Sequence, residues 1–563
     1  MSTPARSVPV ESAEPAANAN IARHLAFMAA SRPEATALKI PRGRTSAGDI
    51  DYLALTFAGL AAEVDAWRAL LAARGVRRGD RTLVMVRPGL PLIASAFALF
   101  QIGAVPVIID PGMGLRNFLA CVTRSRPRVL VGIPLARAIS RVFRRAFRSI
   151  EVRVAVSSSL VARLSPLAPG KVENDMARTA PDELAAILFT SGSTGAPKGV
   201  CYEHGMFEAQ VRLIRETYGI APGEIDLPML PIFALFNPAL GLTTIVPEID
   251  PRRPAAVDPA KIVQAILQEN VTTSFGSPTL WRKIFDHCLA RNLTLPGLRR
   301  VLCAGAPVPL SLYADSRKVL TGGRLYSPYG ATEALPVSST HADEFLAKEV
   351  IADSDRFGTS IGRPVSGMEV RIIAITDEAV ADIAETRELL TGEIGEIIVR
   401  GPVVTKGYDG LAEATAAAKI ADGRTVWHRM GDCGRIDGAG RLWFCGRKAE
   451  RVITAEGTLF TDPCEQVFRM NFAGLRVALI GLGSPGQMTP ALVIENTPIA
   501  KDRKLFFAVL RQAALSHPHT AGITHFFLHP RFPVDTRHNA KIHRLALAKW
   551  AATARAHEGE TAS

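Results

Sequence analysis

Apolar side chains recur along the first part of the chain with two different spacings. Residues Leu53–Ala73 carry them at the spacing of a helix, whereas Arg81–Val86 is a short apolar run typical of a buried strand. The segment Leu92–Phe100 predicts the next helix. Helices that alternate with short β-branched runs are the pattern of βαβ units, so we expect an α/β fold.

Further strand patterns follow along the chain. Val129–Gly132, Val152–Ser157 and Leu184–Phe189 are short strands, and the last leads directly into a loop rich in Ser, Gly and Thr. Glu369–Ile375 and Glu396–Val399 are strand patterns bounded by Gly and Pro, which predicts a β-rich subdomain.

The alternation restarts after Trp443–Gly446. The elements expected there are a helix at Cys464–Met470, strands at Arg476–Ile480 and Pro490–Ile494, a helix at Leu505–Ser516, a strand at Ile523–Leu528 and a final helix. We therefore expect a large N-terminal domain over residues 1–446, built of mixed sheets with flanking helices and starting with a flexible tail at 1–20. A small, mobile α/β lid at 447–563 would follow a hinge near Arg447–Ala449.

Composition and charge exclude several classes of protein. With 48% hydrophobic and 21% charged residues, the chain is neither disordered nor collagen-like. Its 66 basic and 53 acidic residues give a net charge of +13, but aromatic residues make up only 6% and no block of like charge stands apart, so we expect no nucleic-acid partner. The seven cysteines form no C-x-x-C pair, and no secretory leader is visible, which indicates a reducing, cytoplasmic location.

Three local patterns have simpler interpretations than the function they suggest. Pro88–Ile109 has no charge, but Pro91, Gly103 and Pro106 interrupt it, so we expect a helix, a turn and a strand rather than a membrane span. Gly358–Gly362 fits the G-x-S-x-G elbow of hydrolases, yet Pro364 disfavours the required helix. The glycines of Gly481–Gly486 precede another strand and therefore predict a hairpin loop.

The strongest local pattern is Phe189–Gly199, which leaves the end of an apolar strand. Its three glycines let the backbone approach an anion, its hydroxyls add donors, and Lys198 adds a positive charge. Pro197 stands where a Walker A loop has Gly, so the loop is of another kind. The pattern predicts a phosphate cradle formed by Thr190, Ser191, Gly192, Ser193, Thr194, Gly195 and Lys198.

This segment resembles the signature of the adenylate-forming superfamily, which includes acyl-CoA synthetases, adenylation domains of peptide synthetases and beetle luciferases. The resemblance covers about residues 20–550, and other motifs of the superfamily follow in order at Ala304–Pro307, Tyr329–Glu333, Gly392–Tyr408, Met430–Asp432, Gly446–Arg447 and Asn539–Ile542. It implies ATP and Mg²⁺ as cofactors and an attack of a carboxylate on the α-phosphate that expels pyrophosphate. Such a site must supply cations and oriented donors where negative charge builds.

The resemblance also implies roles for single residues. Tyr329 would pack on the adenine, Thr332 would meet the α-phosphate and Glu333 would serve the Mg²⁺. Asp432 and Arg447 would bind the ribose, and Lys541 would span the substrate carboxylate and the α-phosphate. Further nucleotide contacts are expected from Gly305, Ala306, Pro307 and Gly330, and the catalytic residues would be Lys541, Thr190, Lys198 and Glu333.

Departures from the superfamily pattern bear on the substrate. The segment Leu230–Gly241 has Ala234 where many acyl-CoA synthetases place an aromatic residue or His, which widens the acyl pocket. That pocket is expected to comprise Phe233, Ala234, Phe236, Asn237, Gly305 and Ala331. The hinge has Ala449 where relatives carry Asp or Lys, and Met430 and Ala540 replace the usual Thr and Gly.

The segments Leu230–Gly241 and Glu333–Pro336 are together similar to the β-lactone synthetases of bacterial long-chain olefin biosynthesis. That resemblance implies a 2-alkyl-3-hydroxy fatty acid as substrate, whose own 3-hydroxyl attacks the activated carbonyl, and neighbouring olefin-pathway enzymes as candidate partners. Holding that hydroxyl in line makes the step intramolecular. Two alternatives stay open, namely a long-chain acyl-CoA ligase and a non-catalytic member that binds nucleotide or nucleic acid.

A basic segment, Ala136–Ile150, is expected to form one amphipathic helix. Ile139, Val142, Phe143, Ala146 and Phe147 would share one face, and arginines would occupy much of the rest. We favour a surface helix packed on the sheet over a membrane-docking role.

Overall fold

The computed structural model describes residues 18–156, 176–190, 196–250, 256–472, 474–495, 503–534, 541–554 and 557–558. Most of the expected tail at 1–20 and the cradle residues Ser191–Gly195 therefore lie outside the described residues. Within the described part, the chain forms mixed sheets covered by helices, which is the α/β fold expected from the sequence.

One six-stranded sheet carries the start of the segment Phe189–Gly199. In spatial order its strands are β6 (Val152–Ala155), β5 (Val129–Gly132), β3 (Arg81–Met85), β4 (Val105–Ile109), β7 (Leu184–Thr190) and β8 (Lys198–Glu203). The pairings from β6 to β7 are parallel and β8 returns antiparallel to β7. The adjacent strands β7 and β8 thus flank the segment expected to cradle phosphate.

A nine-stranded sheet forms the second layer of the N-terminal part. In order its strands are β16 (Arg363–Pro364), β14 (Ala334–His341), β13 (Arg324–Ala331), β12 (Arg300–Cys303), β11 (Thr273–Gly276), β9 (Ile225–Pro228), β10 (Thr243–Ile245), β1 (Thr36–Arg44) and β2 (Ile50–Thr56). The central pairings are parallel, and β14 and β2 join antiparallel at the two sides. Ligands of such sheets bind beyond the carboxyl ends of the parallel strands.

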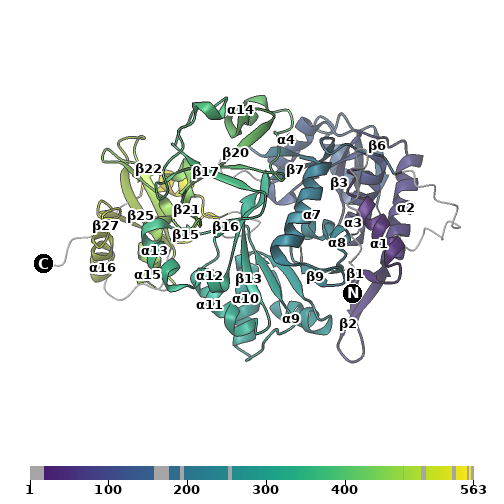
Figure 1. Cartoon of the computed structure of the whole chain (residues 1–563), viewed down its shortest axis with the longest axis horizontal. Coiled ribbons are helices and arrows are strands. Elements are labelled where there is room, and N and C mark those ends of the chain that lie inside the picture. Colours follow the sequence, from purple (N-terminus) through teal and green to yellow (C-terminus); the bar gives the residue numbers. More distant parts are fainter. Residues whose placement is uncertain are drawn as a thin grey trace, which may run out of the picture.

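Helices cover both sheets (Figure 1). In the N-terminal part they are α1 (Arg23–Ser31), α2 (Phe57–Ala73), α3 (Leu90–Ile102), α4 (Leu115–Ser125), α5 (Pro134–Val142), α7 (His204–Tyr218), α8 (Asn237–Leu240), α9 (Pro259–Gln268), α10 (Pro278–Leu289), α11 (Leu310–Val319), α12 (Ala342–Phe345) and α13 (Lys348–Phe357). The short 3₁₀ helices η1 (Pro111–Met113) and η2 (Pro231–Leu235) lie in loops between them. The apolar helix α3 buries its residues from Ile93 to Phe100 in the largest core cluster.

The β-rich subdomain expected from the sequence is present. Its strands are β15 (Thr359–Ser360), β21 (Leu442–Arg447), β20 (Thr425–Ile436), β18 (Gly395–Arg400) and β17 (Glu369–Ile373), with β19 (Lys419–Asp422) paired to β20. The 3₁₀ helix η4 (Ile383–Glu385) and helix α14 (Ala412–Ala418) complete it. Ser360 lies in a strand rather than at the start of a helix, as expected for a segment that is not a nucleophile elbow.

The C-terminal part begins with the 3₁₀ helix η5 (Lys448–Glu450) and lies on the left of Figure 1. Its strands are β22 (Val452–Ile453), β23 (Thr458–Leu459), β24 (Val477–Leu482), β25 (Thr489–Glu495), β26 (His525–His529) and β27 (His557–Glu558), and its helices are α15 (Thr461–Asn471), α16 (Arg503–Leu515) and α17 (Arg544–Ala551). The two core clusters of this part contain only residues from Val452 onward. The expected hairpin at Gly481–Gly486 is confirmed by the antiparallel pairing of β24 with β25.

Charged contacts flank Ala449 on both sides. Lys448 Nζ lies 3.0 Å from Glu396 Oε1, a fully buried carboxylate of the β-rich subdomain. On the other side, Glu450 pairs with Arg544 of the C-terminal part at 3.0 Å. Ala449 therefore lies between one ion pair to the β-rich subdomain and one ion pair to the C-terminal part.

Two expected helices have different bounds in the structure. The helix expected at Leu53–Ala73 begins only at Phe57, because the residues up to Thr56 pair with β1 and the Thr56 side chain accepts from Gly59 N as a cap. The helix expected over Ala136–Ile150 ends at Val142, and Val142 is 73% exposed instead of sharing the buried face.

The uncharged stretch Pro88–Ile109 forms α3 and β4, as expected. Among the described residues, the helices are all too short or too polar to cross a bilayer.

Candidate active site

A large cavity of about 3150 Å³ lies where the two N-terminal sheets, the β-rich subdomain and the C-terminal part meet. It collects residues expected to bind the nucleotide and residues expected to bind the acyl chain. Those that line it are Lys198, Phe233, Ala234, Phe236, Gly305, Ala306, Pro307, Tyr329, Gly330, Ala331, Thr332, Glu333, Asp432, Arg447 and Lys541. Motifs separated by more than 300 residues in sequence thus form one cavity wall.

Glycines shape the two turns that follow the parallel strands. Gly305, in the loop after β12, has a φ of +98°, which L-residues rarely adopt. At Gly330, near the end of β13 and next to the tight turn into β14, a Cβ would lie 2.4 Å from the Ala334 carbonyl oxygen. These turns bring the loop at Gly305–Pro307 and the residues Tyr329–Glu333 to the cavity.

One corner of the cavity joins Tyr329, Asp432 and Arg447. The Tyr329 hydroxyl donates to Asp432 Oδ2 over 2.6 Å, and Arg447 Nη1 lies 2.8 Å from Oδ1. Burial raises the pKa of Asp432 above its ordinary value, while Arg447 and Tyr329 favour its charged form. Oδ1 is buried and accepts no aligned hydrogen bond from a described residue, so it fits a ligand hydroxyl such as those of a ribose.

A second corner joins Glu333 to the end of the phosphate cradle through Tyr408. The Tyr408 hydroxyl donates to Glu333 Oε1 over 2.8 Å, and Lys198 Nζ lies 4.7 Å from the centre of the Tyr408 ring. A cation over the face of an aromatic ring is attracted by it. Tyr408 therefore orients both the carboxylate and the ammonium group of this corner.

Other side chains fix the backbone of the same turn. The Tyr202 hydroxyl donates to the Thr332 carbonyl over 2.6 Å, and Gln210 Nε2 donates to the Leu335 carbonyl over 3.0 Å. Thr405 donates from its backbone N–H to the Glu333 carbonyl over 2.9 Å. The turn that carries Thr332 and Glu333 is thus held from three sides.

Lys419 is a buried lysine close to this corner. Its Nζ donates to Thr405 Oγ1 over 3.2 Å, and its burial lowers its pKa to about 7 although Glu333 opposes the shift. Tyr408, Thr405 and Lys419 were not assigned to the site from the sequence. Thr405 and Tyr408 lie within the motif at Gly392–Tyr408, which implies no role for them, and Lys419 lies outside every motif named above.

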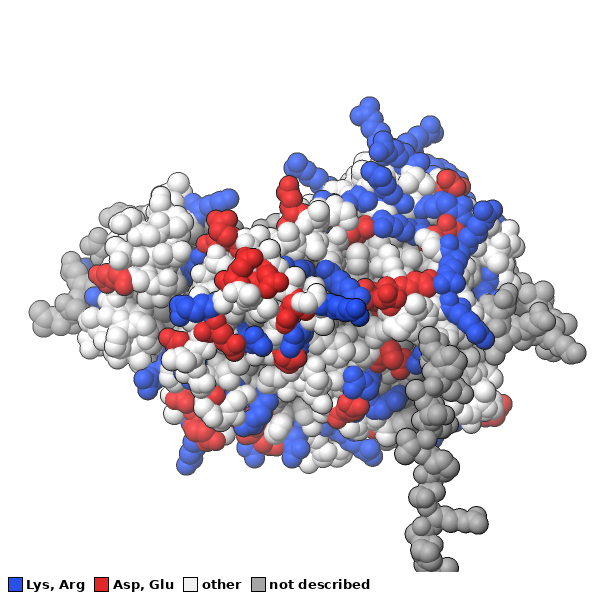
Figure 2. All heavy atoms as spheres, turned by 45° about the horizontal axis from the view of Figure 1, so that its top comes forward, with Lys and Arg blue, Asp and Glu red and all other residues white. Residues whose placement is uncertain are grey.

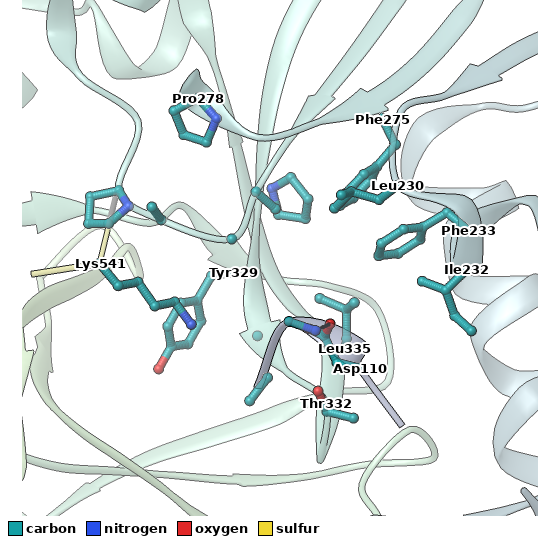
Figure 3. Close-up of a pocket in the computed structure, with 18 of the residues that line it drawn as sticks. Asp110, Leu230, Ile232, Phe233, Phe275, Pro278, Tyr329, Thr332, Leu335 and Lys541 are labelled. Atoms are coloured by element: carbon teal, nitrogen blue, oxygen red, sulfur yellow. Dashed lines mark hydrogen bonds between the residues drawn. The ribbon is translucent and has the colours of Figure 1, made fainter. Parts of the chain in front are cut away.

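Lys541 reaches the cavity from the C-terminal part. Figure 3 shows its side chain running toward the Tyr329 ring, on the same side of the pocket. Its positive charge also favours the ionised form of Asp432. The C-terminal part therefore contributes a cation to the corner built by the N-terminal part.

The opposite side of the cavity is apolar. The Phe233 and Phe275 rings stack with centroids 3.7 Å apart, and the Phe236 ring lies 6.1 Å from that of Phe207. Leu230, Ile232 and these two stacked rings lie together across the pocket from Tyr329 and Lys541 (Figure 3). Ala234 contributes only a methyl group to this wall.

The structure does not place every expected site residue on the cavity wall. Asn237 lies away from the cavity wall, because its side chain is buried and donates to Asp226 and Thr244 over 2.8 and 2.9 Å. Thr190 ends β7, and its side chain is not among those described. Ser191–Gly195 lie outside the described residues.

The donor set fits a magnesium nucleotide. Mg²⁺ in such sites is held by one or two carboxylates together with phosphate oxygens and water. Glu333 supplies a carboxylate of which only Oε1 is hydrogen-bonded to described residues, and Lys198 and Lys541 supply positive charge for phosphates. Among the described residues, no group of three or more His, Cys, Asp or Glu side chains could hold a metal by itself.

Known proteins resemble this chain in sequence over most of its length. The family model "AMP-binding enzyme" matches residues 26–409. The olefin β-lactone synthetases of Xanthomonas campestris pv. campestris and Stenotrophomonas maltophilia are each 44% identical, over 95% and 94% of this chain and 98% of their own lengths.

A solved structure also shares the fold. The amide bond synthetase McbA from Marinactinospora thermotolerans superimposes with a TM-score of 0.77 at 22% identity, over 95% of this chain and 99% of its own. By the family match, by its relatives and by the site that its motifs form, this chain belongs to the family of AMP-binding enzymes, the adenylate-forming ligases.

Proposed function

We propose that this enzyme activates a 2-alkyl-3-hydroxy long-chain fatty acid with ATP and then closes it to a β-lactone. The first step forms an acyl-adenylate and pyrophosphate. In the second step the 3-hydroxyl oxygen attacks the activated carbonyl carbon, the bond to AMP breaks, and the hydroxyl proton is released. The relatives named olefin β-lactone synthetases, 44% identical over nearly the whole chain, support this reaction.

Residues of the charged side carry the activation step in this proposal. Asp432 and Arg447 hold the ribose, Tyr329 packs on the adenine, and Lys198 and the cradle residues hold phosphate oxygens. Lys541 draws the carboxylate toward the α-phosphate, because it offers a positive charge to both anions as they approach. Glu333 and the phosphates would hold Mg²⁺, which supplies charge neutralisation for the departing pyrophosphate.

The apolar side accommodates the substrate's two chains. An α-branched acid needs room beside the reacting carbonyl, and Ala234 leaves that room in a wall that is otherwise lined by Phe233 and Phe236. Contacts with this wall would hold the acid so that its hydroxyl lies close to the carbonyl carbon. An oriented intramolecular nucleophile can replace a second substrate with a large gain in rate.

The single observation that carries the proposal is the continuity of the cavity. One wall joins the Asp432 and Lys541 corner to the apolar surface around Phe233, with Thr332 and Glu333 in between. A carboxylate can therefore reach the phosphate region while its alkyl chains remain among apolar side chains. A long-chain acyl-CoA ligase would share this layout, so the fate of the adenylate separates the two functions.

The remaining partners and the location are proposals of the same kind. Neighbouring enzymes of olefin formation would supply the hydroxy acid and consume the lactone. All seven cysteines are free thiols, which fits a reducing compartment such as the cytoplasm.

A pair of matched acids tests the proposal. The 3-hydroxy acid should release AMP over many turnovers without CoA. The same 2-alkyl acid without the hydroxyl should release pyrophosphate in a burst of about one equivalent and then stall as the adenylate. If both acids turn over at the same rate without CoA, the hydroxyl is not the nucleophile and the proposal is wrong.

A further inference from the structure

The segment from Pro111 to Ile150 is unusual in charge. It contains nine arginines and no acidic residue in forty positions. Six of these arginines are exposed, and none of the six forms an ion pair with a described carboxylate. They are Arg116, Arg126, Arg141, Arg144, Arg145 and Arg148, and together they are called the arginine face.

Contacts within the segment bring its parts together on one side of the six-stranded sheet. The Phe118 ring of α4 lies 6.5 Å from the Phe147 ring, and Ser149 Oγ donates to the Pro127 carbonyl over 2.9 Å. Both rings point into the core under β3, β4 and β5. Figure 2 shows basic side chains gathered at the upper right, over the part of the molecule where Figure 1 places α4 and β6.

Apolar side chains are exposed within the same segment. Leu115, Leu135 and Val142 are 51%, 54% and 73% exposed, although aliphatic side chains of this size favour burial. The aromatic rings Phe118, Phe143 and Phe147 instead pack against the core. The segment thus presents isolated aliphatic groups between arginines, without the exposed rings on which nucleic-acid bases stack.

The active-site cavity reaches this surface. Met113, Ala136 and Ile139 line it from within, and Leu135 both lines the cavity and is exposed at the start of α5. The same short helix therefore forms part of the cavity wall and part of the outer surface. A long alkyl chain bound in the cavity would therefore lie close to the arginine face and to any partner docked on it.

We propose that the arginine face docks on an anionic lipid bilayer and that the long-chain acid passes between bilayer and cavity beside α5. Arginines near an anionic bilayer add electrostatic attraction, and exposed aliphatic groups can insert at the interface of headgroups and acyl chains. Docking itself requires no catalysis. Only its purpose, the delivery of a long-chain substrate, rests on the proposed function.

Vesicle binding by the full-length protein tests the docking without substrate. The protein should sediment with vesicles of phosphatidylcholine and phosphatidylglycerol, bind far less to pure phosphatidylcholine, and dissociate as salt is raised. The triple variant Arg141→Glu, Arg144→Glu, Arg145→Glu should bind anionic vesicles on the order of 100-fold more weakly. The matched control reverses Arg291, Arg299 and Arg387, which are exposed and form no ion pair with described residues, and should bind as the wild type does.

Adenylate formation with a water-soluble acid serves as the folding control, and both triple variants should retain it. Three results would overturn the proposal: equal binding to neutral and anionic vesicles, an unchanged affinity in the arginine-face variant, or an equal loss in the control variant. Tighter binding to duplex RNA than to anionic vesicles, lost in the same variant, would assign the face to nucleic acid instead. Failure of lactone formation would leave each of these binding results unchanged.

Discussion

The two sides of the cavity are lined by different kinds of side chain. The charged side gathers Lys198, Glu333, Asp432, Arg447 and Lys541, and most of these contact an orienting side chain such as Tyr329 or Tyr408. The acyl side is lined by aromatic and aliphatic groups around Phe233 and Phe275 (Figure 3).

This difference shows where each step of the reaction obtains its chemistry. Activation joins two anions, so it depends on charges that the protein holds in place. Ring closure needs a nucleophile near the carbonyl, and the described acyl wall offers chiefly shape, so the nucleophile comes from the substrate. Substitutions on the charged side should therefore lower the activity more than substitutions on the apolar side.

The largest effect is expected for Lys541→Ala. Loss of a cation that meets developing charge should slow adenylate formation by about 10²–10³-fold, while ATP binding is retained. Single-turnover formation of acyl-AMP measures the first effect, and a direct ATP-binding measurement checks the second. Lys549→Ala, which removes an exposed cation of α17, is the matched control. An unaltered rate in Lys541→Ala would remove this residue from the active site.

Glu333→Ala and Asp432→Ala should slow the nucleotide half-reaction by about 10²-fold. Exchange of labelled pyrophosphate into ATP, dependent on the acid, measures this step. Glu413→Ala changes an exposed carboxylate of α14 and should leave the exchange unchanged. Wild-type exchange in either site variant would refute the assignment of that residue.

Tyr408→Phe probes how the charged side is held in place. It removes the hydrogen bond to Glu333 but keeps the ring beneath Lys198, so we expect about a tenfold rise in the Mg²⁺ concentration needed for half-maximal ATP binding. Tyr408→Leu, which also removes the ring, should have the larger effect. Equal ATP binding by wild type and both variants at limiting Mg²⁺ would show that Tyr408 orients neither group.

The smallest effect is expected on the apolar side, for Ala234→Phe. The added ring narrows the wall beside the reacting carbonyl, so kcat/KM for a 2-alkyl acid should fall about tenfold, since misfit in an apolar pocket costs roughly 1–3 kcal/mol. An unbranched 3-hydroxy acid should be affected less. A loss of equal size for both acids would mean that Ala234 does not provide room for the branch.

The same difference explains what the sequence could predict. The residues of the charged side lie in short sequence motifs, so Asp432, Glu333 and Lys541 could be predicted. The structure brings these three residues to one cavity. The α/β fold followed from alternating periods, and most strands lie within a residue or two of the expected positions.

Contacts between distant segments could not be read from local patterns. Tyr408 and Lys419 approach Glu333 only after the β-rich subdomain packs on the N-terminal sheets. The sequence places Asn237 in the acyl pocket, but its amide instead donates to Oδ2 of the buried Asp226. The helix predicted over Ala136–Ile150 is longer than the observed one. The spacing of apolar residues continues beyond Val142 through turns that pack Phe143 and Phe147 in the same core.

Product analysis in the presence and absence of CoA tests the central claim most directly. The enzyme is incubated with ATP, Mg²⁺ and a 2-alkyl-3-hydroxy acid, and the products are identified by mass spectrometry. We expect a species lighter than the acid by one water, formed with AMP at the same rate whether or not CoA is added. A CoA thioester as the dominant product when CoA is present would contradict the account and identify the enzyme as an acyl-CoA ligase.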